Sequence, residues 1–382
     1  MNPERQTTSL RPVVLSSVVL GLVWMGDALI YVVLPLYADA FGIPLTLVGV
    51  VLSLNRIVRI LGYGWLGQLS RRFAAHKIMA VSAAMGAIST LAYGLLRGVV
   101  ALLAARLLWG LAYGILNVFT TVYATGDGGI GRRIGLSRAI STCGPVLALS
   151  IGAYLAVTLG PQEVFIVLGA VGLAAIPLAL LLPDLRDLDP ENSPPPGSRW
   201  RPSSLHVLFF TIGLVVDGVF PMTLSLILAQ TFSPESAVLA AGLTLLLLRT
   251  ATLVGSLVGG DLADRMDARR VLAVASIALL IGLVGVAAGR VFEGAAIIIL
   301  TRAVLWTVGP VLVLRERGGT KVERLAAFST WVDCGLAAGP LLAGLLFLPL
   351  GAPGLYLLLA ATLGATLVCY FILTRTSVRG SP

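Results

Sequence analysis

The stretch GDLADRMDARRVL, residues 260–272, repeats in altered form the stretch GQLSRRFAAHKIM, residues 67–79. The tripeptide CGP ending at Pro145 recurs as AGP ending at Pro340, at nearly the same spacing. Between the copies lies the polar, proline-rich segment PDLRDLDPENSPPPGSRWRPSS. A repeat on this scale indicates two halves of similar structure joined by a linker. The predicted parts are residues 1–182, 183–204 and 205–382.

Each half consists mainly of long apolar runs. Hydrophobic residues make up 57% of the chain and charged residues only 12%, against roughly 25% charged residues in soluble domains. A helix needs about 20 residues to cross a bilayer, and the chain therefore reads as an all-α membrane protein with six crossings in each half. The twelve predicted spans are 12–37, 46–69, 78–96, 99–123, 136–159, 163–182, 205–230, 236–260, 271–289, 294–314, 325–348 and 352–373.

Other classes of site are poorly supported. The glycines of GYGWLGQLSRR, residues 62–72, have the G-x-G-x-x-G spacing of a dinucleotide site, which requires a preceding strand in a βαβ unit. Here they end an apolar helical run, where small residues serve close helix packing. The three cysteines lie inside predicted spans without C-x-x-C spacing, so neither disulfides nor a thiolate metal site is indicated. We expect no cofactor, no metal and no enzymatic activity.

The net charge of +9 reflects membrane topology. Lys and Arg concentrate at both termini and in alternate loops, including 71–77 and 315–324, whereas Arg97 and Arg290 fall in the opposite set of loops. Because positively charged loops stay in the cytoplasm, we expect a multi-pass protein of the inner (plasma) membrane with both termini and the central linker cytoplasmic. We expect a monomer in the lipid bilayer, and no nucleic-acid partner.

Ionisable residues inside the spans follow a regular pattern. Spans 3, 6, 9 and 12 hold none. An ionisable group at the bilayer centre costs at least ~2.5 to 3.5 kcal/mol, so the spans that carry one must face protein or water. Every third helix is therefore expected to face lipid. The ionisable residues within the other spans are Asp27, Arg56, Arg59, Arg106, Arg138, Asp217, Arg249, Arg302 and Asp333.

Two six-helix halves, a long central loop and peripheral helices at every third position resemble the major facilitator superfamily of transporters. The loop after span 8 is similar to the family's G-x-L-A-D-R-x-G-R-R motif through Gly260, Asp264, Arg265 and Arg269, with Asp267 in the place of a glycine. The resemblance implies that this loop takes part in gating.

The copy of that motif in the first half departs from the family. Gly67 and Arg72 keep their places, but Arg71 stands where the acid is expected and Ala74 where the glycine is expected. The departure puts in doubt the usual latch, formed by that acid, between span 2 and span 11.

Two further motifs concern coupling. The sequence RLLWGLAYG, residues 106–114, is similar to the R-x-x-x-G-x-x-x-G pattern of proton-coupled members. The sequence GLAAGPLLAG, residues 335–344, is similar to the exporter motif G-x-x-x-G-P-x-x-G-G, which the family usually has in span 5. The resemblance implies proton-coupled export. The helix-packing residues it picks out are Gly144 and Pro145 in span 5 and Gly335, Gly339 and Pro340 in span 11.

Depth along the helices suggests charge pairs. At 1.5 Å per residue, Asp27 and Arg56 lie about 22 and 20 Å from the inner ends of their spans, and Asp217 and Arg249 about 18 and 17 Å. An Asp and an Arg at one depth can neutralise each other, so each Asp is expected to pair with that Arg. We favour a structural role for Asp217 with Arg249 and a coupling role for Asp27, because span 1 should line the central cavity. Arg106, at about 25 Å, competes for Asp27. The buried residues without an obvious partner are Arg59, Arg106 and Arg302.

The candidate site residues follow from these patterns. Arg106, Trp109 and Tyr113 share one face of span 4, and Trp306 follows Arg302 by one turn, although such aromatic stripes also occur in ordinary helix packing. The proton-coupling candidates are Asp27, Arg106, Asp217 and Asp333. The substrate-cavity candidates are Arg56, Arg59, Trp109, Tyr113, Arg249, Arg302 and Trp306.

We expect a secondary transporter that moves a small organic, amphipathic solute by alternating access of its two halves, with proton-coupled export as the first choice. One alternative is uptake or exchange of an organic anion held by Arg106 and Arg302. Another is a transport-inactive membrane sensor or scaffold, against which the paired gating loops and the charged spans argue.

Overall fold

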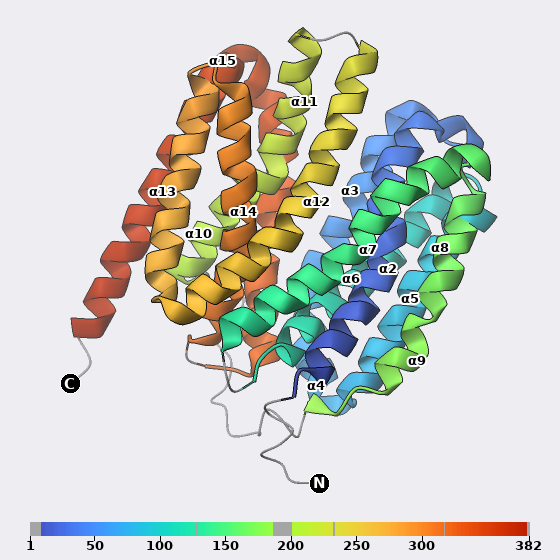
Figure 1. The fold of residues 1–382 in the computed structure, drawn as a ribbon, viewed down its shortest axis with the longest axis horizontal. Coiled ribbons are helices and arrows are strands. Elements are labelled where there is room, and N and C mark those ends of the chain that lie inside the picture. The colour runs from blue at the N-terminus through green and yellow to red at the C-terminus, as the bar shows by residue number, and fades with distance from the viewer. Residues whose placement is uncertain (1–8, 127–128, 186–200, 232–233, 317, 380–382) are drawn as a thin grey trace. The chain divides into compact units, whose positions relative to one another are not determined.

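The computed structural model describes residues 9–126, 129–185, 201–231, 234–316 and 318–379, and the regular elements within these ranges are all helices (Figure 1). The prediction of an all-α membrane protein is confirmed. The first half forms α2 (Arg11–Leu36), η1 (Ala38–Phe41), α3 (Leu45–Gly62), η2 (Tyr63–Trp65), α4 (Leu66–Arg72), α5 (Ala75–Leu95), α6 (Val99–Tyr123), α7 (Ile130–Thr158), α8 (Glu163–Leu173) and α9 (Ala175–Leu180). The second half forms α10 (Ser204–Gly213), η4 (Leu214–Val219), α11 (Phe220–Thr231), α12 (Pro234–Arg265), α13 (Ala268–Ala287), α14 (Val291–Leu314) and α15 (Lys321–Arg379).

The last helix accounts for two predicted spans. Within the described residues, 11 helices are long and apolar enough to cross a membrane, and the last of these runs for 54 residues from Lys321 to Thr374. Gly351 interrupts its helical geometry with φ 62° and ψ 177°, a conformation that glycine adopts without a steric penalty. The break falls between the predicted spans 325–348 and 352–373, so the twelve-span fold agrees with these helices.

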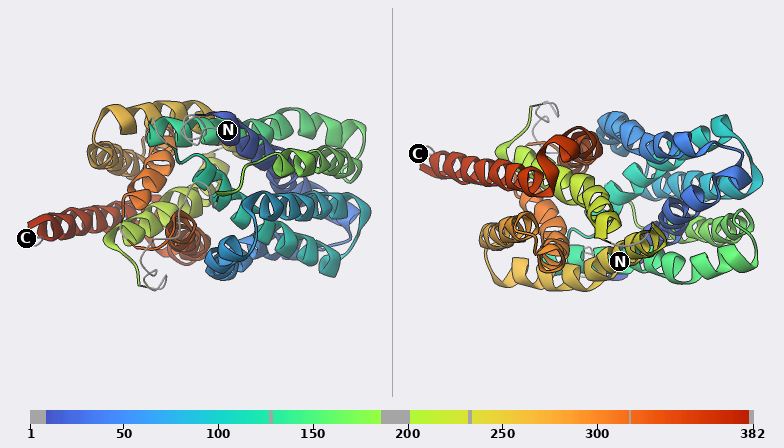
Figure 2. Two further views of the ribbon diagram at one scale, coloured as in Figure 1. Left: turned by 90° about the horizontal axis from the view of Figure 1, so that it is seen from below. Right: turned by 90° about the horizontal axis from the view of Figure 1, so that it is seen from above.

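The chain divides into two compact units. The first contains Met1–Pro196 together with Arg317–Ala326, and the second contains Gly197–Glu316 together with Ala327–Pro382. The short segment 317–326 belongs to the second half of the sequence but groups with the first unit. In each unit the helices run side by side as a bundle (Figure 2).

Glycines set the closest helix contacts in both units. A Cβ on Gly144 of α7 would lie 2.0 Å from the carbonyl oxygen of Gly21 on α2, and one on Gly339 of α15 would lie 2.4 Å from Cα of Gly218 in η4. A Cβ on Gly335 would lie 2.1 Å from the carbonyl oxygen of Phe210. Only glycine allows such approaches. The predicted packing residues therefore lie where spans 1 and 5, and spans 7 and 11, meet.

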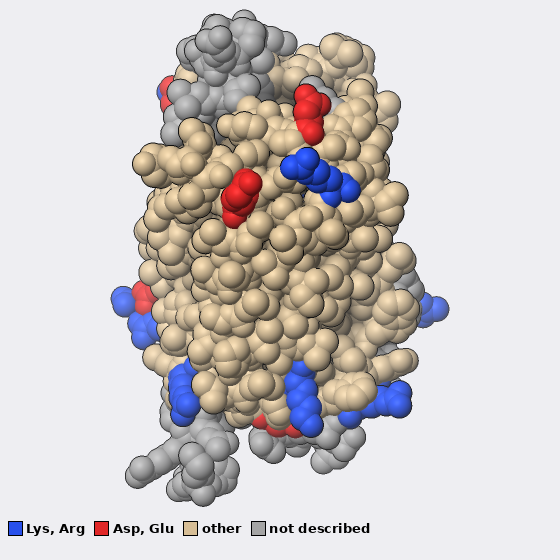
Figure 3. Space-filling view, turned by 90° about the vertical axis from the view of Figure 1, so that its right-hand side faces the viewer, with Lys and Arg blue, Asp and Glu red and all other residues tan. Residues whose placement is uncertain are grey.

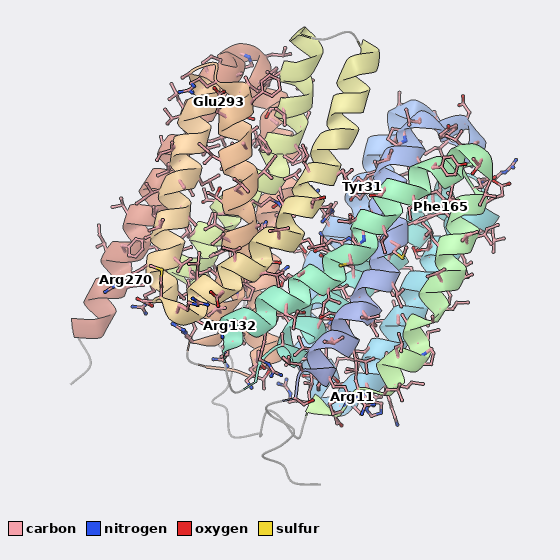
Figure 4. The ribbon with its side chains drawn as sticks, in the orientation of Figure 1. Arg11, Tyr31, Arg132, Phe165, Arg270 and Glu293 are labelled. Atoms are coloured by element: carbon pink, nitrogen blue, oxygen red, sulfur yellow. The ribbon has the colours of Figure 1, made fainter. Side chains whose placement is uncertain are left out.

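Charged side chains lie mainly toward the ends of the bundles. Figure 3 shows a face of the molecule whose centre is uncharged, with charged groups toward its two ends. Arg11 and Arg132 lie at the end of the first unit that holds α4, and Arg270 and Glu293 lie at opposite ends of the second unit (Figure 4). This distribution suits helices that cross a hydrocarbon layer.

Candidate functional site

Each unit holds an Asp–Arg pair in its interior, and the first pair is enclosed. Arg106 on α6 donates from Nη1 to the carboxylate of Asp27 on α2. Its Nη2 donates to the Tyr31 hydroxyl at 3.0 Å and to the Leu52 carbonyl oxygen at 3.0 Å, while Nε donates to the Val51 carbonyl oxygen at 3.3 Å. Backbone oxygens of α3 and a hydroxyl of α2 therefore fix the guanidinium plane against the carboxylate.

Burial of this first pair is almost complete. The Arg106 side chain is 0% exposed and the Asp27 side chain 6%. The Arg106 guanidinium also lies 5.2 Å from the centre of the Tyr31 ring, which Figure 4 labels. Two opposite charges that neutralise each other and fill their hydrogen-bonding capacity can remain buried, whereas either one alone cannot. Both charges of this pair are therefore compensated within the first unit.

The second pair has different neighbours. Arg302 on α14 donates from Nε and Nη2 to Oδ1 of Asp217, at 2.9 and 2.7 Å. Trp306, one turn further along α14, donates from its indole nitrogen to Oδ2 of Asp217 at 2.7 Å. The remaining terminal nitrogen of Arg302 donates to the Thr252 hydroxyl on α12 at 2.6 Å. Both oxygens of this carboxylate are bound to side chains of a single helix.

The backbone around Asp217 is π-helical over the six residues Leu214–Val219. At the end of this segment, the N–H of Phe220 donates to the carbonyl oxygen of Val215. Such segments are rare and often occur at functional sites. The Asp217 side chain is 18% exposed and that of Arg302 11%. This pair is therefore more open than the pair of Asp27 and Arg106.

Depth predicted the partners only in part. Of the two arginines expected to compete for Asp27, Arg106 binds it and Arg56 does not. The expected pair of Asp217 with Arg249 is wrong, because Asp217 binds Arg302. Depth along a helix says nothing about which way a side chain points, and a long Arg side chain spans a depth difference of two residues. Arg106 and Arg302, which had no obvious partner in the sequence, each bind an aspartate in the structure.

The remaining charged candidates differ in burial. Arg56 on α3 and Arg249 on α12 are half-buried. Asp333 on α15 is 5% exposed and Arg59 on α3 is 7% exposed.

Aromatic rings and guanidinium groups form a stack beside the first pair, which we call the ring stack: Trp24, Arg59, Trp109 and Tyr113. The rings of Trp109 and Tyr113 stack with centres 4.9 Å apart and an angle of 18° between their planes. Arg59 lies 5.0 Å from the centre of the Tyr113 ring, and Trp24 packs against that ring at 5.2 Å. Arg106 lies 5.7 Å from the centre of the Trp109 ring.

The two glycines of the R-x-x-x-G-x-x-x-G pattern lie beside the ring stack. A Cβ on Gly110 would lie 2.6 Å from the carbonyl oxygen of Asn55, so α6 approaches α3 closely at this position. A Cβ on Gly114 would lie 3.4 Å from Cγ of Arg59, so the Arg59 side chain packs directly against this turn of α6.

The altered motif of the first half, predicted to take part in gating, contacts an acidic residue that is distant in the sequence. Arg71, at the end of α4, donates to the carboxylate of Glu323 in the first turn of α15. A Cβ on Gly67 would lie 2.6 Å from Cγ of Glu323, so this glycine leaves room for the contact. Relative to the family motif the charges are exchanged, because the cation lies on the loop and the anion on the helix.

Glu323 also caps its own helix. Its Oε2 accepts from the N–H of Thr320 at 2.9 Å, and the Thr320 hydroxyl accepts from the N–H of Glu323 at 3.2 Å. This reciprocal arrangement is a capping box, and a carboxylate at a helix N-terminus is also favoured by the helix dipole. The capping box therefore fixes the position of the Glu323 carboxylate that Arg71 contacts.

The copy of the motif in the second half is exposed to solvent. After Gly260 near the end of α12, Arg265 pairs with Asp261 at 2.7 Å, and Asp264 and Arg269 are exposed. Arg72 of the first copy is exposed as well. Asp267 accepts from the N–H of Arg269 at 3.3 Å and so caps α13. The backbone of Asp267 has φ −64°, so no glycine is required at this position.

Sequence reasoning missed three residues that complete these contacts: Tyr31, Thr252 and Glu323. Two of them carried a usable signal. Tyr31 follows Asp27 by one turn on the same face of α2, and the T-x-x-E pattern beginning at Thr320 is that of a capping box. Thr252 carried no signal, because a hydroxyl in an apolar helix usually bonds its own backbone. Thr252 does this as well, donating to the Leu248 carbonyl oxygen at 2.7 Å.

Comparison with known proteins identifies the family. No curated protein matches the sequence. The structure of the human organic anion transporter MFSD10 (TETRAN) is similar to this one, with a TM-score of 0.74 and 18% sequence identity over 96% of this chain and 99% of that chain. At that identity the likeness shows the fold. The family model of the Major Facilitator Superfamily matches residues 16–314, and the chain therefore belongs to this superfamily of transporters.

Proposed function

We propose that this secondary transporter exports a small, amphipathic organic solute in exchange for protons, and that Asp217 binds the proton. The observation that supports the proposal is the setting of Asp217. Its carboxylate bonds Arg302 and Trp306 from a π-helical segment and is 18% exposed. Ionisable groups within a membrane protein commonly mark proton relays. Asp27, the other paired carboxylate, is enclosed and serves as the structural counterpart.

Protonation of Asp217 would change the balance of charge in the second unit. The ionised acid neutralises Arg302, so the pair together carries no net charge. A proton on the carboxylate removes the anion and leaves the guanidinium with its contact to Thr252. An uncompensated cation at this depth is unfavourable. The helices that carry these residues therefore favour a different arrangement when the proton is bound, which is the requirement for coupling.

Transport of an organic anion is the second candidate. The similar human structure is described as an organic anion transporter. In this chain, however, Arg106 and Arg302 already donate to aspartates, so the geometry disfavours them as anion-binding groups. We propose that Arg59, whose guanidinium lies over the Tyr113 ring, attracts the anionic group.

The membrane topology is part of the proposal. We place the protein in the inner membrane with both termini and the 183–204 linker in the cytoplasm, because the basic loops belong on that side. Reporters fused after Arg375 and within the linker should both give cytoplasmic signals. A periplasmic signal from either fusion would contradict this orientation.

The coupling proposal can be tested with Asp217→Asn. A thermal-shift screen against metabolites and drugs first identifies a substrate of the purified protein. Proteoliposomes then compare accumulation of that substrate under a pH gradient with exchange at equal pH. We expect Asp217→Asn to lose gradient-driven accumulation and to retain exchange, because the amide still accepts hydrogen bonds but cannot cycle a proton.

The matched control is Glu293→Gln, which removes an exposed carboxylate whose partner is Arg290. This variant should transport as the wild type does. Wild-type accumulation by Asp217→Asn would eliminate Asp217 as the coupling residue. In vesicles with an imposed pH gradient, substrate flux in the same direction as protons would favour uptake over export.

A further inference from the structure

The indole N–H of Trp109 is buried without a hydrogen-bond partner among the described residues. The residue is 1% exposed. An indole N–H can only donate, and a buried donor without a partner destabilises a fold. Phe at this position would have avoided the penalty while keeping the stacked ring.

A second unsatisfied group lies on the facing helix. Oδ1 of Asn55 on α3 is buried and also accepts no hydrogen bond in the described structure. Asn55 lies against α6 at Gly110, the residue that follows Trp109. The same helix contact therefore holds a donor and an acceptor that do not satisfy each other.

A guanidinium group lies over each of the two stacked rings, Arg106 over Trp109 and Arg59 over Tyr113. Asp27 neutralises Arg106, so the positive charge beside Tyr113 is that of Arg59. Guanidinium groups favour carboxylate and other acceptor oxygens. Trp24 and Tyr113 are half-buried, so part of the surface of each residue remains exposed.

We infer that the ring stack is the substrate site and that it binds an aromatic ring carrying a hydrogen-bond acceptor, as in an aromatic carboxylate. This inference rests on the proposed transport of an organic solute and specifies its chemical class. The aromatic part packs on Trp24 and Tyr113, and the acceptor oxygen receives the Trp109 N–H beside Arg59. The N–H is covered in the present conformation, so binding requires the stack to open.

The test uses the purified full-length protein and two probes of similar shape, 2-naphthoate and 2-naphthylmethylammonium, with binding measured by calorimetry at pH 7. We expect naphthoate to bind at least about tenfold more tightly than the cation. Trp109→Phe should raise the Kd for naphthoate about tenfold or more, the usual effect of losing a hydrogen bond to a charged group. Trp65→Phe, at a residue 65% exposed, should leave the Kd unchanged.

Tyr113→Leu supplies a second variant if Trp109→Phe does not fold, as judged by its thermal unfolding. It should also weaken naphthoate binding. Absence of naphthoate binding, equal binding of both probes, or an unchanged Kd in the folded variants would overturn the inference. Binding needs no gradient, and Asp217→Asn should retain it. Loss of naphthoate binding would therefore count against this site, whereas loss of gradient-driven accumulation with intact binding would concern coupling alone.

Discussion

The enclosed pair of Asp27 and Arg106 and the more open pair of Asp217 and Arg302 occupy corresponding helices of the two halves. In the first, the guanidinium is held by backbone oxygens and a tyrosine and is 0% exposed. In the second, the carboxylate is held by Arg302 and Trp306 in a π-helical segment and is 18% exposed. The same pair of residue types is thus enclosed in one half and partly exposed in the other, and on this difference we base the proposal that only the second pair exchanges a proton.

The largest expected difference concerns stability. Asp27→Asn leaves Arg106 buried without a counter-charge, and breaking a buried pair in this way costs about 3 to 5 kcal/mol. Asp217→Asn should cost less, because its pair is more accessible to water. Thermal unfolding of both variants in detergent measures the difference. If the two variants lose the same amount of thermal stability, the two pairs do not differ in how much they stabilise the fold.

A double variant sharpens this result. Replacing both members, as Asp27→Leu with Arg106→Met, removes the two charges together. It should recover much of the stability lost in Asp27→Asn, because apolar replacement of a buried pair is often neutral or stabilising. If the double variant is no more stable than the single one, contacts other than the charge pair hold the helices together.

A smaller effect is expected from the aromatic partners. Trp306→Phe removes a hydrogen bond to an ionised carboxylate, worth about 1.5 to 3 kcal/mol. Tyr31→Phe removes one of several bonds to Arg106 and should cost nearer the lower end of that range. Only Trp306→Phe should alter the pH dependence of transport, because only Trp306 touches Asp217. A changed pH profile in Tyr31→Phe would assign coupling to the first pair instead.

The gating loops should affect stability least. The Arg71 side chain is 48% exposed, and surface ion pairs contribute about 0 to 1 kcal/mol. Glu323→Gln keeps the capping box and removes the charge, whereas Glu323→Ala loses both. We therefore expect Glu323→Ala to be the less stable of the two, and both to slow turnover. Exchange of the charges in Arg71→Glu with Glu323→Arg should restore part of the transport rate, and no recovery would argue against a role for the pair.

The second loop provides the comparison. Asp264→Ala should impair turnover while the protein remains folded in the membrane, if the loop after α12 has the gating role that the family motif implies. Transport assays and size-exclusion profiles measure the two properties separately. Unchanged transport would limit gating to the loop of Arg71.

The sequence by itself determined the helical membrane fold, the two-part repeat and the family. These follow from apolar runs that must satisfy their backbone hydrogen bonds within helices and from motifs that persist in both halves. It also found both aspartates and both arginines of the pairs, since charges inside apolar spans are conspicuous.

The tertiary structure decided which charges meet. Asp27 reaches Arg106, and Arg71 reaches Glu323 more than two hundred residues away, because helix rotation and close approach at glycines direct each side chain. Neither hydropathy nor depth contains that rotation. The π-helical segment at Asp217 was equally hidden, because a change of one residue in helical register depends on packing around the segment and leaves no pattern in its composition.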